Sequence, residues 1–294
     1  MKKSVNLYFY NTDTKRKIDA IKNAGYDGIF LSYKNNTENM TLEEQIEYCK
    51  KINLEVSMIH CEYNIQDLNN FWLENNKIAD EAMNFYIHQI ESIAQFNVSN
   101  FVMHANGPIQ PTLSKFGLKR IENILKTCEK YNINLCIENL EYPSVVEYIL
   151  ENIKHPNLYF CYDTGHKNCF APDSEIAKKY NSKLIINHIH DNLGFHDDHL
   201  ILGSGTIDID NLANEMKDCK AEYLSAEIRY KNSELSIDEI LQRNLKSLTI
   251  LDEKITQLNK NNWWFYIFCV IFCVNLDSFY LQTNSKFNIK NTQI

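Results

Sequence analysis

Nine imidazole and carboxylate side chains stand at or just after the ends of strand-like segments in this sequence. They are His60, His104, Glu138, Asp163, His166, His188, Asp197, His199 and Glu227. The densest stretch runs from His188 to His199, where four histidines and three aspartates follow the apolar run Leu184–Ile186. Groups packed this closely repel one another or compete for protons unless a cation or a substrate organises them. Imidazole and carboxylate are good ligands for divalent ions, so we predict a metal site.

Eight strand-like segments alternate with eight amphipathic segments between residues 1 and 258. The expected strands are Val5–Tyr10, Gly28–Ser32, Leu54–His60, Asn100–His104, Leu135–Glu138, Leu158–Asp163, Leu184–His190 and Tyr223–Ile228. The expected helices lie near 13–24, 41–52, 74–96, 114–131, 144–152, 173–181, 208–218 and 236–255. This alternation indicates parallel strands joined by helical crossovers. Eight repeats are the number that closes a (β/α)₈ TIM barrel, so we predict an α/β fold with one such domain.

Two further features bear on the barrel prediction. The sequence predicts capping boxes at the starts of three helices, formed by Thr41 with Glu44, Ser144 with Glu147, and Ser236 with Glu239. An open doubly wound sheet is the structural alternative, but no glycine-rich turn follows the first strand. In a TIM barrel the C-terminal ends of the strands form one rim, where active sites lie. Six consecutive strands, from the third to the eighth, would therefore deliver an imidazole or a carboxylate to the same rim.

The net charge and the arginine and cysteine content indicate which classes of binding partner and which cellular environment to expect. The net charge is −8, and only four arginines occur, which is few for a protein that binds a phosphate backbone. We therefore expect neither nucleic acid nor a membrane as the main partner. The nine cysteines include no CxxC pair, and Cys128, Cys136 and Cys161 fall inside apolar segments. No signal-peptide pattern follows Met1, so we expect a reducing, cytoplasmic environment.

Residues 259–294 form an apolar C-terminal tail of different composition. Trp263–Val274 is an uninterrupted apolar run of twelve residues. Spanning a bilayer takes about 20 such residues. We expect the tail to pack on the barrel or on a partner, with contact to a membrane surface as one alternative. Its abrupt change of composition is also compatible with a segment that is not native coding sequence, and we assign it no catalytic role.

Residues 1–255 resemble the xylose isomerase-like TIM-barrel superfamily. The resemblance rests on Ile-Glu138-Asn, Tyr-Asp163-Thr-Gly-His166, His188-Ile-His-Asp191-Asn, Asp197-Asp-His199-x-x-x-Gly203-x-Gly205 and Ala-Glu227-Ile, in this order. For its isomerase and epimerase branches it implies one Mn²⁺, Mg²⁺ or Co²⁺ held by Glu138, Asp163, His188 and Glu227. Glu138 and Glu227 would then exchange a proton with a sugar or sugar phosphate through a cis-enediolate. His190 and Arg229 are candidate substrate contacts, with His190 as an alternative support for the metal ligands.

A second branch of the same superfamily, endonuclease IV, leads to a different expectation. There the resemblance implies three Zn²⁺ held by all nine residues named at the outset, and cleavage of DNA beside abasic sites. The loop 33–39 carries no arginine or apolar wedge suited to entering DNA, which argues against this branch. A metal-stabilised binding protein without turnover is the third alternative. Members of the superfamily often form dimers or tetramers, so a homo-oligomer is compatible with the resemblance.

Overall fold

Eight parallel strands form the centre of the computed structural model, which describes residues 1–33, 39–63, 68–74, 77–231 and 234–260. The strands are β1 Lys2–Asn6, β2 Gly28–Ser32, β3 Glu55–His60, β4 Asn100–Met103, β5 Asn134–Glu138, β6 Leu158–Asp163, β7 Leu184–His188 and β8 Tyr223–Ala226. They are ordered β7-β6-β5-β4-β3-β2-β1-β8. A parallel bridge between Ile189 and Ala226 joins the two end strands, and the Ile189 N–H donates to the Ser225 carbonyl at 2.8 Å. The predicted TIM barrel is confirmed.

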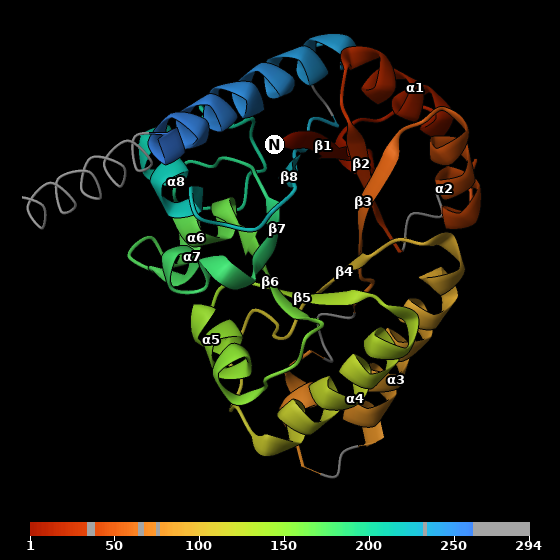
Figure 1. Ribbon diagram of the computed structural model, residues 1–294, viewed down its shortest axis with the longest axis vertical. Helices are drawn as coiled ribbons and strands as arrows, with labels where there is room; N and C mark the ends of the chain where they lie inside the picture. Colours follow the sequence, from red (N-terminus) through yellow and green to blue (C-terminus); the bar gives the residue numbers. More distant parts are fainter. Residues whose placement is uncertain (34–38, 64–67, 75–76, 232–233, 261–294) are drawn as a thin grey trace, which may run out of the picture.

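Helices surround the strands on the outside (Figure 1). They are α1 Thr14–Ala24, α2 Leu42–Lys51, α3 Lys77–Ile93, α4 Lys115–Tyr131, α5 Pro143–Asn152, α6 Thr164–Phe170, α7 Ile176–Lys179 and α8 Ile209–Met216. A last helical segment covers 237–260. The capping boxes at Thr41 and Ser236 are confirmed, because each side chain accepts from the backbone three residues on and the glutamate there accepts in return.

Three local predictions were wrong. The first strand ends at Asn6, where the chain turns into a 3₁₀ helix at Leu7–Phe9 instead of continuing to Tyr10. Helix α5 begins at Pro143, whose fixed φ suits the first helical position, so Ser144 lies inside the helix and caps nothing. The helix expected at 173–181 is only the single turn α7, and the sequence analysis missed α6, which follows β6 directly.

Two groups of apolar side chains hold the barrel together. The larger group fills the layer between the strands and the surrounding helices. The smaller group lies inside the barrel and consists of Phe30, Met58, Val102, Cys136, Cys161 and Ile186. Phe30 stacks on the ring of His188, with centroids 5.2 Å apart. The inner group therefore forms an apolar floor beneath the rim residues and excludes water from that side.

Residues 261–294, which hold most of the expected apolar tail, lie outside the described residues. Within the part of the chain that the structure describes, no helix is both long enough and apolar enough to cross a membrane. The cysteines described there are free, and Cys128, Cys136 and Cys161 are buried as expected.

Candidate metal centre

Four side chains at the ends of β5, β6, β7 and β8 form what we call the inner cluster. These are Glu138, Asp163, His188 and Glu227, and they offer four ligand atoms that all lie within 4.8 Å of one another. His188 Nδ1 lies 3.2 Å from Glu138 Oε1, 3.6 Å from Asp163 Oδ2 and 3.0 Å from Glu227 Oε2. All four residues are buried. The structure thus brings together the four residues expected to hold one metal ion.

Glu138 also faces a second group at the ends of β3 and β4. Its Oε2 lies 3.2 Å from His60 Nε2 and 3.1 Å from His104 Nε2, and the two imidazole nitrogens are 3.1 Å apart. Its other oxygen faces His188. One buried carboxylate therefore belongs both to the inner cluster and to a group with His60 and His104.

Histidines are the cationic partners of the three inner carboxylates. In the described part of the chain, no lysine or arginine nitrogen lies within 4 Å of Glu138, Asp163 or Glu227. Burial by itself raises the pKa of Glu138, but His188 and His104 hold that pKa well below its usual value. Burial by itself also raises the pKa of Glu227, but His188 holds that pKa well below its usual value. Protonated histidines compensate the charge of these buried carboxylates, and a divalent cation bound among them would take over that role.

Backbone carbonyls orient three of the imidazoles. His60 Nδ1 lies 2.9 Å from the Cys61 carbonyl, His166 Nδ1 3.0 Å from the Asn139 carbonyl, and His199 Nδ1 3.0 Å from the Glu227 carbonyl. A carbonyl only accepts, so each of these Nδ1 atoms carries the proton. With Nδ1 directed to a carbonyl, Nε2 of each ring is the atom left to meet a metal ion, the orientation typical of metal-ligating histidines. The donor set fits a divalent metal, and a soft or borderline ion suits its imidazoles better than magnesium does.

An outer cluster lies beside the inner one, on helix α6 and on the segments that follow β7 and β8. It consists of His166, Asp197 and His199, with Arg229 next to them. Asp197 Oδ2 lies 2.8 Å from His199 Nε2 and 3.7 Å from His166 Nε2. Burial opposes ionisation of Asp197, but His166 and His199 lower its pKa strongly. The guanidinium of Arg229 reaches His199 Nε2 at 3.1 Å.

His190 connects the inner and outer clusters. Its side chain is fully buried, and its Nε2 lies 3.0 Å from both oxygens of Asp163. The ring stacks on His199 with centroids 4.2 Å apart. A Cβ at Gly165 would lie 1.9 Å from His190 Cε1, so a side chain there would displace the ring. The structure therefore places His190 against a metal-ligand candidate and beneath the surface of the site.

Asp191 organises the long segment between β7 and α8 that carries the outer cluster. Its carboxylate accepts hydrogen bonds from the backbone N–H groups of Asn192, Gly203, Gly205 and Ile207 at 2.8–3.1 Å. A Cβ at Gly205 would lie 2.4 Å from Asp191 Oδ1, and Gly203 has φ of 88°. The backbone at the two glycines therefore packs closely against the Asp191 carboxylate.

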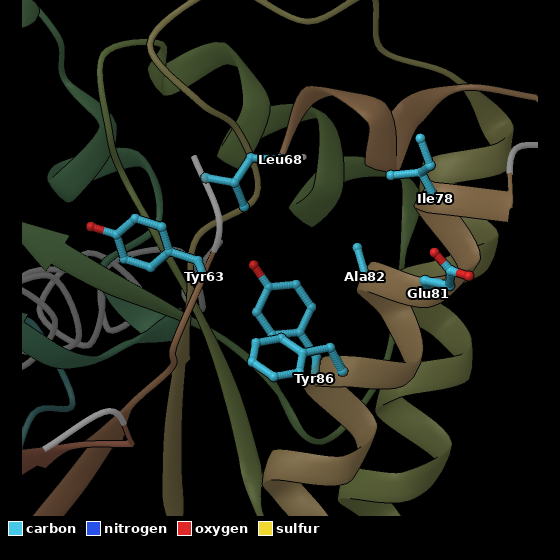
Figure 2. A pocket seen from close by; sticks show the side chains of 7 residues that line it. Tyr63, Leu68, Ile78, Glu81, Ala82 and Tyr86 are labelled. Atoms are coloured by element: carbon cyan, nitrogen blue, oxygen red, sulfur yellow. The ribbon is translucent and has the colours of Figure 1, made fainter. Parts of the chain in front are cut away.

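Two tyrosines complete the surroundings of the clusters. The Tyr8 hydroxyl donates to Glu227 Oε1. Tyr63, which the sequence analysis missed, packs its ring on His104 at a centroid distance of 4.1 Å. It also lines a cavity of about 280 Å³ against α3, and Figure 2 shows its hydroxyl pointing away from that helix. The available signal was its place three residues after the strand-end His60. Trp72 donates its indole N–H to the Ala105 carbonyl at 2.8 Å and is buried against α4.

Two histidines, His88 and His155, lie outside the inner and outer clusters. His155 Nδ1 accepts from the Asn157 backbone N–H at 3.2 Å, and His88 lies on an exposed face of α3. His196 has no part in the four groups of ligand atoms found among the described residues.

Comparisons with known proteins agree with this architecture. An uncharacterised protein of Sinorhizobium fredii is 21% identical over 241 residues, which are 69% of this chain and 76% of the relative. The structure of a D-tagatose 3-epimerase-like protein superposes with a TM-score of 0.69 at 20% identity, covering 89% of this chain and 99% of the other. The IOLI protein with a bound zinc atom gives a TM-score of 0.72 at 18% identity, covering 87% and 99%. The profile of the xylose isomerase-like TIM barrel matches residues 18–250. The chain belongs to the xylose isomerase-like TIM barrel family.

Proposed function

We propose that the chain is a divalent-metal-dependent isomerase or epimerase of a sugar or sugar phosphate. The observation that carries this proposal is the placement of two buried carboxylates against the same nitrogen of one imidazole. Glu138 Oε1 and Glu227 Oε2 lie 3.2 and 3.0 Å from the same His188 Nδ1. The family membership and the similarity to the structure of a D-tagatose 3-epimerase-like protein support the same reaction class.

Glu138, Asp163, His188 and Glu227 would hold the metal ion of this reaction. A divalent ion held by these residues would polarise a carbonyl and a neighbouring hydroxyl of the substrate and so make the adjacent C–H more acidic. The inner donor set accommodates manganese, cobalt, magnesium or zinc, and the imidazoles favour the ions other than magnesium. The zinc atom in one protein of the same fold is in keeping with this donor set.

The two glutamates would move the proton. Both are held ionised, so either can accept a proton from the substrate carbon. One removes the proton to form a cis-enediolate, and the other returns a proton to the same or the neighbouring carbon. The Tyr8 hydroxyl donates to Glu227 and fixes the direction of its oxygens. The apolar floor below His188 limits competing exchange with water.

Arg229 and His190 receive different roles in this proposal. The Arg229 side chain is exposed at the rim, where its N–H donors can meet a hydroxyl or phosphate group of the substrate. His190 is a positioning residue, because it is buried and holds both oxygens of Asp163. Sugar recognition would otherwise depend on the loops around the rim.

Proton exchange with solvent tests the proposal directly. The metal-loaded protein is incubated in deuterium oxide with a panel of ketoses, aldoses and their phosphates, and deuterium at the carbon next to the carbonyl is followed by NMR. We expect incorporation and product with the wild type and a loss of at least about 10³-fold with Glu138→Gln and with Glu227→Gln. Glu122→Gln, at an exposed position of α4, is the matched control. Full activity of either site variant on the identified substrate would contradict the assigned proton transfer.

The convergence of all nine imidazole and carboxylate residues on one rim favours a second candidate. An enzyme with three zinc ions that cleaves DNA at abasic sites would use the inner and outer clusters together. The test is cleavage of a duplex with a single abasic site by zinc-loaded protein, with a duplex lacking that site as control. Cleavage at the abasic site that disappears with Asp197→Asn would establish this activity. No cleavage by the zinc-loaded wild type would exclude it.

A further inference from the structure

Helix α3 holds the backbone beside Tyr63, which follows the strand-end His60 by three residues. The Glu62 N–H donates to Gln89 Oε1 at 2.7 Å, and Gln89 Nε2 donates to the Glu62 carbonyl at 3.0 Å. The Gln89 side chain is fully buried, so this pair of hydrogen bonds ties the segment after β3 to the helix. The fold therefore fixes the backbone from which the Tyr63 side chain extends.

The ring of Tyr63 lies between the candidate metal centre and an apolar cavity. On one side its centroid is 4.1 Å from the ring of His104 and 6.2 Å from the ring of His60. On the other side it lines the cavity of about 280 Å³ together with Phe85 and Tyr86 of α3. Figure 2 shows its hydroxyl pointing away from that helix. The hydroxyl is therefore directed away from the cavity, while the ring packs on a candidate metal ligand.

The hydroxyl of Tyr63 differs from two other tyrosine hydroxyls near the site. Tyr8 donates to Glu227, and Tyr86 donates to the His104 carbonyl at 3.2 Å. Within the described chain, the Tyr63 hydroxyl neither donates nor accepts a hydrogen bond. A tyrosine whose ring is packed in place usually directs its hydroxyl to a polar partner. This donor is thus available to a bound molecule.

The charges of the inner cluster act on the Tyr63 side chain. Burial raises the pKa of Tyr63, and the charges of Glu138 and Glu227 add to that effect while Arg229 opposes it, which brings the pKa to about 12. Coulomb interactions weaken with distance, so the phenol lies near groups carried by β5 and β8 although its own segment follows β3. A molecule bound at the inner cluster would have the Tyr63 hydroxyl within its surroundings.

We propose that Tyr63 is a substrate-binding residue of the metal centre, whose hydroxyl donates a hydrogen bond to a hydroxyl group of the sugar. This inference rests on the proposed function, since it takes a sugar as the molecule bound there. It deepens that function by naming a residue that sets specificity. A site that hydrogen-bonds one particular hydroxyl discriminates against sugars that lack it or present it in another direction.

Binding of sugar alcohols tests the inference without turnover, since these compounds lack the carbonyl group and cannot react. The manganese-loaded protein is titrated with ribitol, D-sorbitol and galactitol by isothermal titration calorimetry. We expect the wild type to bind at least one of them, and Tyr63→Phe to bind it about 5- to 10-fold more weakly because one hydrogen bond is lost. Tyr48→Phe, whose hydroxyl donates to Asp19 between α1 and α2, is the matched control and should equal the wild type. Manganese per chain should be the same in all three proteins.

Monodeoxy analogues of the bound sugar alcohol separate a direct contact from an indirect effect. With the analogue that lacks the contacted hydroxyl, the wild type and Tyr63→Phe should bind equally. With every other analogue, the weaker binding by Tyr63→Phe should persist. An unchanged ratio with all of the analogues would overturn the inference, because Tyr63 would then act through the structure of the site.

Two other results would overturn the inference. One is equal binding by the wild type and Tyr63→Phe of every sugar alcohol that binds. The other is no binding of any of the three by the manganese-loaded wild type. Deuterium exchange distinguishes these failures from failure of the proposed function. A sugar turned over equally by the wild type and Tyr63→Phe would contradict the role of Tyr63 alone, whereas Tyr63-dependent binding without turnover of any sugar would contradict the function alone.

Discussion

The inner and outer clusters use the same kinds of side chain but differ in what holds them. Every inner ligand stands on the last residue of a strand or next to it, so the hydrogen bonds of the sheet fix its backbone. The outer residues Asp197 and His199 lie on a long segment whose conformation depends on backbone hydrogen bonds to the Asp191 carboxylate. The surrounding positive charge differs too. Among the described residues, the cationic partners of the inner carboxylates are histidines alone, whereas the guanidinium of Arg229 also lies beside the outer cluster.

The two clusters therefore differ in how precisely the fold positions their side chains. The hydrogen bonds of the sheet fix the backbone of a residue at a strand end, so its side chain is precisely positioned. A residue on a loop is positioned only by the hydrogen bonds within that loop. The inner cluster is therefore suited to a resident metal ion. We propose that the outer cluster instead meets a substrate group.

Removal of one histidine from each cluster should show the largest contrast. His188→Ala leaves three buried carboxylates without their shared cation, so we expect a loss of about 3–5 kcal/mol of unfolding free energy in chelated protein. His199→Ala leaves Asp197 partly exposed and still near His166, so we expect a loss of about 1–2 kcal/mol. Urea denaturation in the presence of chelator measures both. Equal losses would contradict the distinction between the clusters.

Weakening the support of the outer cluster should affect it alone. Asp191→Asn replaces one accepting oxygen with an amide donor that faces backbone N–H groups, which should cost about 2–3 kcal/mol. We expect faster hydrogen exchange in residues 193–207, while the metal content of the inner cluster stays unchanged. Asp210→Asn, at an exposed position of α8, is the control. Unchanged hydrogen exchange in peptides from residues 193–207 would show that the hydrogen bonds to Asp191 do not determine the conformation of this segment.

The smallest effect that we predict is a pH dependence confined to chelated protein. Burial disfavours the protonated ring of His166, but Asp163 and other carboxylates outweigh it and raise its pKa to about 10. The folded pKa therefore exceeds the unfolded value of about 6.5, and the stabilising contribution is complete below that value. It is lost progressively as the pH rises from about 6.5 toward 10.

Thermal unfolding checks this dependence. The Tm of chelated protein should fall by several degrees between pH 6.5 and 8.5, and the Tm of metal-loaded protein should fall less, since the bound ion replaces the protons as counter-charge. A metal-loaded Tm that falls as steeply as the chelated one would contradict this account.

Three of the strand ends that carry candidate ligands were predicted to the residue, whereas β1, β7 and β8 end before their expected ends and the short helix α6 was missed. His60, Glu138 and Asp163 end their strands as expected, because a buried strand is marked by an apolar run that stops where the polar residue begins. The start of α5 was misplaced because Ser144 and Glu147 match a capping box while Pro143 fixes the first turn. Helix α6 was missed because its seven residues, Thr164–Phe170, are too few for a periodic pattern to emerge.

By itself, the order of apolar and polar residues determined the barrel and the set of side chains on its rim, since both follow from local patterns repeated eight times. Only the tertiary structure decided how that set divides. The sharing of Glu138 between two groups, the burial of His190 beneath Asp163, and the contact of Arg229 with His199 depend on distances between residues far apart in the chain. Such distances are set by the closure of the barrel and by the path of the loops, which no local pattern in the sequence encodes.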